Sequence, residues 1–136
     1  MSARFDNVVA IMARLRAPGG CPWDRKQTHE SLKPYLIEET YEALDTIDRQ
    51  DFAKLKEELG DVLLQVLFHA RIAEDAPENS FDIDDVADAL VRKLGNRVPA
   101  VLAGESITLE DQLAQWEQRK ALEKSTRDSC IDDIPT

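Results

Sequence analysis

Two short acidic motifs in this sequence have the spacing of metal ligands on a pair of helices. Glu39 and Glu42 are three residues apart, and so are Glu58 and Asp61. Residues three apart on an α-helix share one face, with Cβ atoms about 5–6 Å apart, so each motif would present two carboxylates side by side. Carboxylates without histidine or cysteine suit a hard cation such as Mg²⁺. The four residues therefore predict a magnesium site, with Mn²⁺ as an alternative ion.

The segment between the two motifs has the length and composition of a helical turn. Residues 48–51 are polar, and a few such residues are enough to close an antiparallel helical hairpin. The two motifs are about equally far from this turn in sequence, so both would stand at similar heights above it. We therefore expect the four carboxylates to face one another. The ordinary alternative, a solvated acidic surface, is less favoured because few cations are interleaved to offset the repulsion.

Apolar periodicity and helix breakers predict an all-α fold, a bundle of about five helices built around this hairpin. The expected helices span residues 5–16, 30–48, 52–74, 83–96 and 109–124. The helix at 52–74 is apolar around most of its circumference, which is typical of a helix in the centre of a bundle or in a subunit interface. We therefore expect a homodimer, or a higher homo-oligomer, to complete the bundle.

The length of 136 residues suggests one domain, which we place at residues 1–124, followed by a tail or linker at 125–136. With 27 acidic and 17 basic residues, the formal charge of −10 disfavours binding to a nucleic-acid polymer. Two cysteines make no disulfide framework, and neither a signal segment nor a membrane span is evident. A cytoplasmic setting without a membrane partner is the default expectation.

The chain resembles the MazG nucleotide pyrophosphohydrolases of the all-α NTP pyrophosphatase group. The sequence from Gly20 to Asp24, with Gln27 and Thr28, is similar to the opening signature of that family. The motifs Glu38-Glu39-x-x-Glu42 and Glu58-x-x-Asp61 are similar to its paired acidic motif, and residues 129–135 to the segment after the domain. The resemblance implies hydrolysis of an NTP or dNTP to the monophosphate and pyrophosphate, with Mg²⁺ on Glu39, Glu42, Glu58 and Asp61.

The resemblance also implies roles for residues outside the four ligands. Glu38 would orient the attacking water or act as its base. Two pairs with a spacing of four residues, which puts each pair on one helix face, would contact the triphosphate and the nucleotide: Lys93 with Arg97, and Trp116 with Lys120. Trp23 is either a base-stacking residue or a core residue of its loop.

Two other functions share much of this pattern. A helical scaffold would bind Mg²⁺ only for its structure, and replacement of the basic and aromatic residues would then leave nucleotide binding unchanged. A nucleotide-binding regulatory domain without turnover, as one half of a longer protein, would keep the same helices. The intact acidic positions argue against loss of turnover and favour an enzyme.

Overall fold

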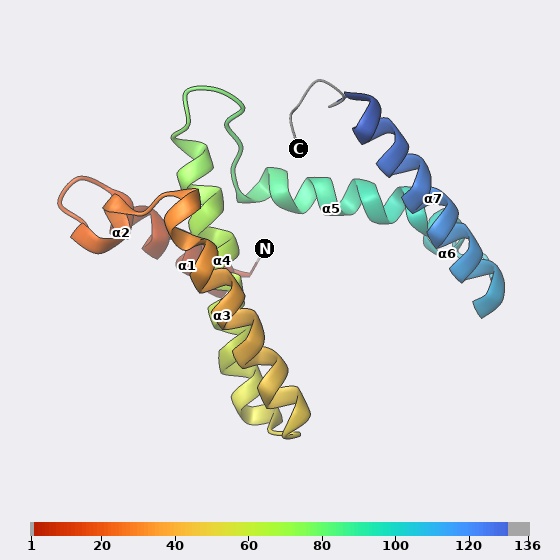
Figure 1. Ribbon diagram of the computed structural model, residues 1–136, viewed down its shortest axis with the longest axis horizontal. Coiled ribbons are helices and arrows are strands. Elements are labelled where there is room, and N and C mark those ends of the chain that lie inside the picture. Colours follow the sequence, from red (N-terminus) through yellow and green to blue (C-terminus); the bar gives the residue numbers. More distant parts are fainter. Residues whose placement is uncertain (1, 131–136) are drawn as a thin grey trace. The chain divides into compact units, whose positions relative to one another are not determined.

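The computed structural model describes the backbone of residues 2–130 and the side chains of residues 2–125, and all its elements are helices. The chain divides near Val86 into two compact units. None of the helices in the described part combines the length and the apolar character needed to cross a membrane. In chain order the helices are α1 (Ala3–Arg16), α2 (Pro22–Lys26), α3 (His29–Asp48), α4 (Phe52–Glu74), α5 (Ile83–Arg97), α6 (Pro99–Leu102) and α7 (Leu109–Cys130) (Figure 1).

The all-α fold is confirmed, but the described residues form seven helices where about five were expected. The two additional helices, α2 and α6, are short, and each begins with a proline, Pro22 or Pro99. Proline is well tolerated in the first turn because its φ is already helical and the N–H it lacks has no partner there. Prolines that sequence analysis takes as helix breakers therefore also begin helices.

Helix α7 extends further than the sequence predicted. It was expected to end at Lys124, but the helical backbone continues to Cys130. Residues 125–130 are polar but contain neither glycine nor proline, so nothing in them stops a helix. The tail or linker at 125–136 stays a prediction, since residues 131–136 lie outside the described part of the chain.

Local hydrogen bonds define where α3 and α4 begin, and these are the two helices that carry the acidic motifs. Thr28 and Ser31 form a capping box, in which each side-chain oxygen accepts a hydrogen bond from the other residue's backbone N–H. Asp51 caps α4 through a bond from Lys54 N to its Oδ1 at 3.1 Å. Between the helices, Gln50 has a φ of 57°, a left-handed conformation that reverses the chain. The two helices consequently lie side by side and antiparallel (Figure 1).

The hydrophobic core of the first unit lies at the end of this helix pair opposite the turn. Met12 from α1, Leu32 from the start of α3 and Phe68 from the last part of α4 are almost fully buried against one another. Arg16 lies over the Phe68 ring at 5.6 Å and donates a hydrogen bond to the carbonyl of Gln27 at 3.2 Å. These contacts join α1 and the loop before α3 to the hairpin, and they leave the end near the turn to be held by α3 and α4 alone.

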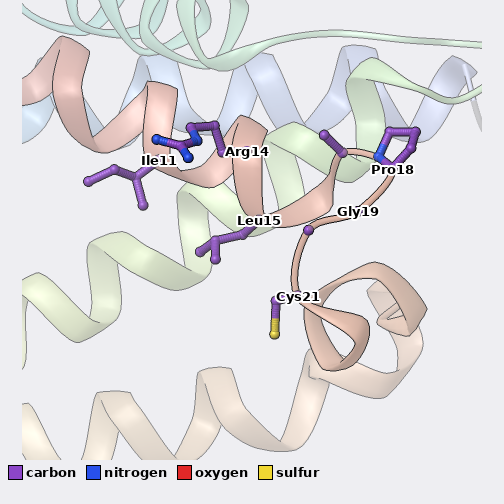
Figure 2. Close-up of a pocket in the computed structure, with 8 residues that line it drawn as sticks. Ile11, Arg14, Leu15, Pro18, Gly19 and Cys21 are labelled. Atoms are coloured by element: carbon purple, nitrogen blue, oxygen red, sulfur yellow. The ribbon is translucent and has the colours of Figure 1, made fainter.

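The loop between α1 and α2 turns back tightly on α1. Gly19 has a φ of 82°, which favours glycine. A Cβ atom on Gly20 would collide with the backbone carbonyls at the end of α1, while Cys21 N donates a hydrogen bond to Leu15 O at 2.8 Å. The loop and the side chains of Ile11 and Leu15 line a cavity of about 480 Å³ (Figure 2). No acidic residue lines it, so this cavity is separate from the acidic motifs.

We expect Gly20→Ala to lower the free energy of unfolding by about 1–3 kcal/mol, because the added methyl group must displace backbone atoms. Urea denaturation followed by circular dichroism measures the change. Gly95→Ala is the matched control, since a Cβ atom there meets open space on α5 and alanine favours a helix. Equal stability of the Gly20→Ala variant and the unmodified chain would contradict the close approach.

Candidate functional site

Helices α3 and α4 bring the four predicted metal ligands together. Glu39 and Glu42 extend from α3, and Glu58 and Asp61 extend from α4. One carboxylate oxygen from each of the four lies within 4.8 Å of those from the other three. Ligand oxygens at about 2.0–2.1 Å from a Mg²⁺ ion are themselves only a few ångströms apart. The cluster is therefore compact enough to hold one hard divalent cation with little movement.

Two of these carboxylates each have one oxygen that is shielded from water. Glu58 is only 9% exposed. Glu39 and Glu58 each have a buried Oε2 atom that accepts no hydrogen bond within the described residues. A buried carboxylate oxygen without a donor or a counter-ion is unfavourable. A bound cation would satisfy both oxygens, so the residues present fit a metal centre.

The electrostatics of the cluster agree with this geometry. Burial, followed by the charge of Glu42, raises the pKa of Glu39 from its usual value of 4.5 to about 7. Burial is also the main reason why the pKa of Glu58 is raised, with Glu42 and Asp61 as the next contributors. Both effects disfavour the ionised form. Without a cation, the cluster therefore retains a proton near neutral pH.

A cavity of about 470 Å³ lies beside the acidic cluster. Glu42 and Glu58 line it and also belong to the cluster, so the cavity adjoins the candidate metal centre. Glu38 lines the same cavity, and its charge contributes to the raised pKa of Glu39. Lys54 supplies a positive charge on the α4 side. The site thus has room for a ligand next to the four carboxylates, with Glu38 at its wall.

The second unit brings together three of the predicted substrate-binding residues. Lys93 and Arg97 from α5 and Lys120 from α7 line one cavity of about 470 Å³. Trp116 joins them through Arg97, whose guanidinium carbon lies 4.9 Å from the centre of the indole ring. This distance is that of a cation–π contact. The indole ring therefore holds the Arg97 guanidinium, and its contact with a nucleotide stays a prediction.

Sequence reasoning missed four further residues around this cavity, namely Arg92, Asn96, Glu123 and Lys124. Glu123 is the most engaged of them, since it accepts hydrogen bonds from both Asn96 and Arg97. One signal was available: Glu123 follows Trp116 by seven residues and Lys120 by three, so all three share a face of α7. Its pairing with α5 is not visible in the sequence.

Trp23 belongs to the first unit and packs against aromatic residues there. Its ring meets Tyr35 edge-to-face with centroids 5.7 Å apart, and Phe68 in the same manner at 6.2 Å. Phe68 is part of the core, yet Trp23 remains 46% exposed. Trp23 lies in α2 rather than in a loop and packs this helix against the core, and base stacking by its exposed part stays a prediction.

Comparison with known proteins gives concordant matches along this chain. Residues 27–102, more than half of the chain, match the model of the MazG nucleotide pyrophosphohydrolase domain. A nucleoside triphosphate pyrophosphohydrolase from Mycolicibacterium smegmatis is 65% identical over 135 residues, which are 98% of this chain and 41% of that protein. One from Escherichia coli K12 is 46% identical over 136 residues, 97% of this chain and 51% of the relative.

A solved structure is similar in fold as well. The crystal structure of a mazG-related protein from Thermotoga maritima superposes with a TM-score of 0.69 at 29% sequence identity, covering 88% of this chain and 99% of that one. The chain spans about two fifths to one half of the length of the M. smegmatis and E. coli relatives. The matching residues include both acidic motifs and the helices that carry them. The chain belongs to the MazG nucleotide pyrophosphohydrolase family.

Proposed function

We propose that this protein hydrolyses nucleoside triphosphates, or their deoxy forms, to the monophosphate and pyrophosphate with the help of Mg²⁺. The observation that carries the proposal is the convergence of four carboxylates, two of which have buried oxygens without a partner. Relatives from M. smegmatis and E. coli named nucleoside triphosphate pyrophosphohydrolase support the reaction. A hard cation such as Mg²⁺ is also well suited to assist the hydrolysis of a charged phosphate substrate.

The acidic residues divide into ligands and a base. Glu39, Glu42, Glu58 and Asp61 hold the ion between α3 and α4. When bound, Mg²⁺ neutralises charge on the phosphate oxygens and makes a water molecule easier to deprotonate. Glu38, at the wall of the adjoining cavity, orients this water and accepts its proton. The water oxygen bonds to phosphorus as the anhydride bond breaks, and pyrophosphate is one of the two products.

The basic and aromatic residues bind the substrate in this proposal. Lys93, Arg97 and Lys120 contact phosphate oxygens, because fixed cations stabilise negative charge there. Trp116 contacts the nucleotide and holds the Arg97 guanidinium against its ring. Trp23 keeps its predicted second role, stacking on a base with its exposed face.

We also propose that the protein acts as a homodimer in which hairpins from two copies pack together. Exposed apolar residues form a stripe on each helix of the pair, with spacings of four and three residues. The stripes consist of Ile37, Tyr41 and Leu44 on α3 and of Leu59, Leu63 and Val66 on α4. Stripes of this kind are unfavourable in water and pack well against a second helical pair.

A product-resolved assay tests the reaction. Incubation with Mg²⁺ and a panel of NTPs should release the monophosphate and pyrophosphate, and Glu39→Gln should lower kcat/KM by at least about 100-fold. Glu30→Gln is the matched control, because Glu30 lies on the same helix, is exposed and is outside the cluster. Release of orthophosphate with NDP, or turnover that survives Glu39→Gln, contradicts the proposal. Nucleotide binding without any product would instead favour the regulatory domain.

The raised pKa of Glu39 gives a separate prediction for stability. The carboxyl ionises near 4.5 in the unfolded chain and near 7 in the folded one, so above pH 7 the folded state carries a charge that its surroundings disfavour. Glu39→Gln should therefore raise the Tm of the metal-free protein at pH 8 and have much less effect at pH 5. It should also remove the rise in Tm that Mg²⁺ causes in the unmodified chain.

Thermal unfolding with and without Mg²⁺ measures both effects. At tenfold the Kd, one bound ion stabilises the folded state by about 1.4 kcal/mol. Glu30→Gln should respond to Mg²⁺ as the unmodified chain does. If Mg²⁺ leaves the Tm of the unmodified chain unchanged at millimolar concentration, the four carboxylates do not form the metal centre.

Light scattering after size-exclusion chromatography tests the dimer. The chain should elute at micromolar concentration with twice the mass of one copy. Leu63→Asp should shift it to the monomer, because a buried charge in the interface is costly. Leu122→Asp, which changes an exposed leucine on α7, should leave the mass unchanged. A monomeric mass for the unmodified chain contradicts the dimer.

A further inference from the structure

The cavity between α5 and α7 has an unusual charge composition for a chain with a net charge of −10. Among the residues whose side chains are described, five cations line it, and Glu123 is the one acidic residue. Positive charge of this density attracts phosphates. The negative charge of Glu123 at the wall of this cavity weakens the attraction for phosphates, so we ask what else the carboxylate does there.

The Glu123 carboxylate is fully engaged with α5. Its Oε2 atom accepts hydrogen bonds from Arg97 Nε at 3.2 Å and from Arg97 Nη2 at 2.7 Å, and its Oε1 atom accepts one from Asn96 Nδ2 at 3.0 Å. The three hydrogen bonds that join α5 to α7 among the described side chains all end on this one group. These bonds also lower the pKa of Glu123, with the bond from Arg97 as the largest cause. The carboxylate is therefore ionised at neutral pH.

The Arg97 guanidinium is held from two directions. Its central carbon lies over the Trp116 ring, 4.9 Å from the ring centre, and the edge formed by Nε and Nη2 is bonded to Glu123. The Nη1 end is not used by the bonds to Glu123. A planar guanidinium held by a ring and along one edge keeps a defined direction for its remaining N–H groups. Without Glu123, the long side chain would sample many rotamers around the indole.

We propose that Glu123 is a positioning residue, which orients Arg97 so that its remaining N–H groups bind a phosphate of the substrate. This inference rests on the proposed function, in which Arg97 contacts the triphosphate. An alternative role for Glu123 is a latch that the phosphate must displace. Displacement would break three hydrogen bonds at once, whereas positioning keeps all of them and removes the need to order Arg97 during binding. Four cations remain unpaired by Glu123, so the cavity still attracts anions.

Binding and kinetics of the full chain separate these roles by the sign of the effect. Isothermal titration with inorganic tripolyphosphate and steady-state kinetics with an NTP should show Glu123→Ala raising Kd and KM about three- to tenfold, with kcat changed by less than about twofold. Removal of a negative charge near an anion site would by itself tighten binding. Glu117→Ala, the same charge change at an exposed position of α7, should lower Kd slightly or leave it unchanged.

Two further variants guard against a purely structural effect. In an Arg97→Ala background, Glu123→Ala should no longer weaken binding, because the residue that it positions is gone. Asn96→Ala removes one bond to Glu123 without touching Arg97, so it should weaken binding in the same direction by less. It also tests the inference if Glu123→Ala fails to fold.

A lower Kd for Glu123→Ala identifies a latch, and an unchanged Kd and KM show that Glu123 has no role in binding; both results overturn the inference. If the unmodified chain turns over an NTP while the Glu123 variants match it, only this inference fails. If the unmodified chain neither binds tripolyphosphate nor releases pyrophosphate, the proposed function fails, and the inference fails with it.

Discussion

The packing of α3 against α4 forces four like charges into a space in which they repel one another. Glu39, Glu42, Glu58 and Asp61 would separate in water, but the helix backbones fix their positions at close range. Burial, together with this repulsion, raises the pKa of Glu39, so the metal-free cluster retains a proton near neutral pH. A bound divalent cation would also reduce the repulsion among the four carboxylates. An arrangement of carboxylates that suits a metal therefore lowers the stability of the metal-free protein, as is common for functional sites held by a rigid scaffold.

The second unit gathers charges of the opposite sign. Around its cavity, cations are gathered on two helices, and one carboxylate, Glu123, is placed among them. The pairing of Glu123 with Arg97, and of Arg97 with Trp116, replaces repulsion by fixed contacts. In both units, residues three or four apart on one helix form part of the candidate site, and a neighbouring helix completes it. Disruption of either helix would therefore disturb its site even if every residue of the site were kept.

The acidic cluster was predictable because its determinants are local. The spacing of three residues and a short turn midway between the motifs set the positions of all four carboxylates. Burial was not predictable in the same way: whether Glu58 is shielded depends on neighbours in space. Glu123 was missed because its partner Arg97 lies 26 residues away, and no pattern within α7 reveals this pairing. The short helices α2 and α6 were missed because Pro22 and Pro99 were treated as helix breakers, whereas each stands in the first turn of a helix.

The proton retained on the Glu39 side chain has a thermodynamic consequence for ion uptake. If the cluster binds a cation as we propose, the ion displaces this proton, so binding near neutral pH would release hydrogen ions into the surrounding solution. Those ions are taken up by the buffer, and the heat of that reaction adds to the heat of ion binding. Calorimetric enthalpies for this site would therefore differ between phosphate and Tris solutions even though the coordination is the same.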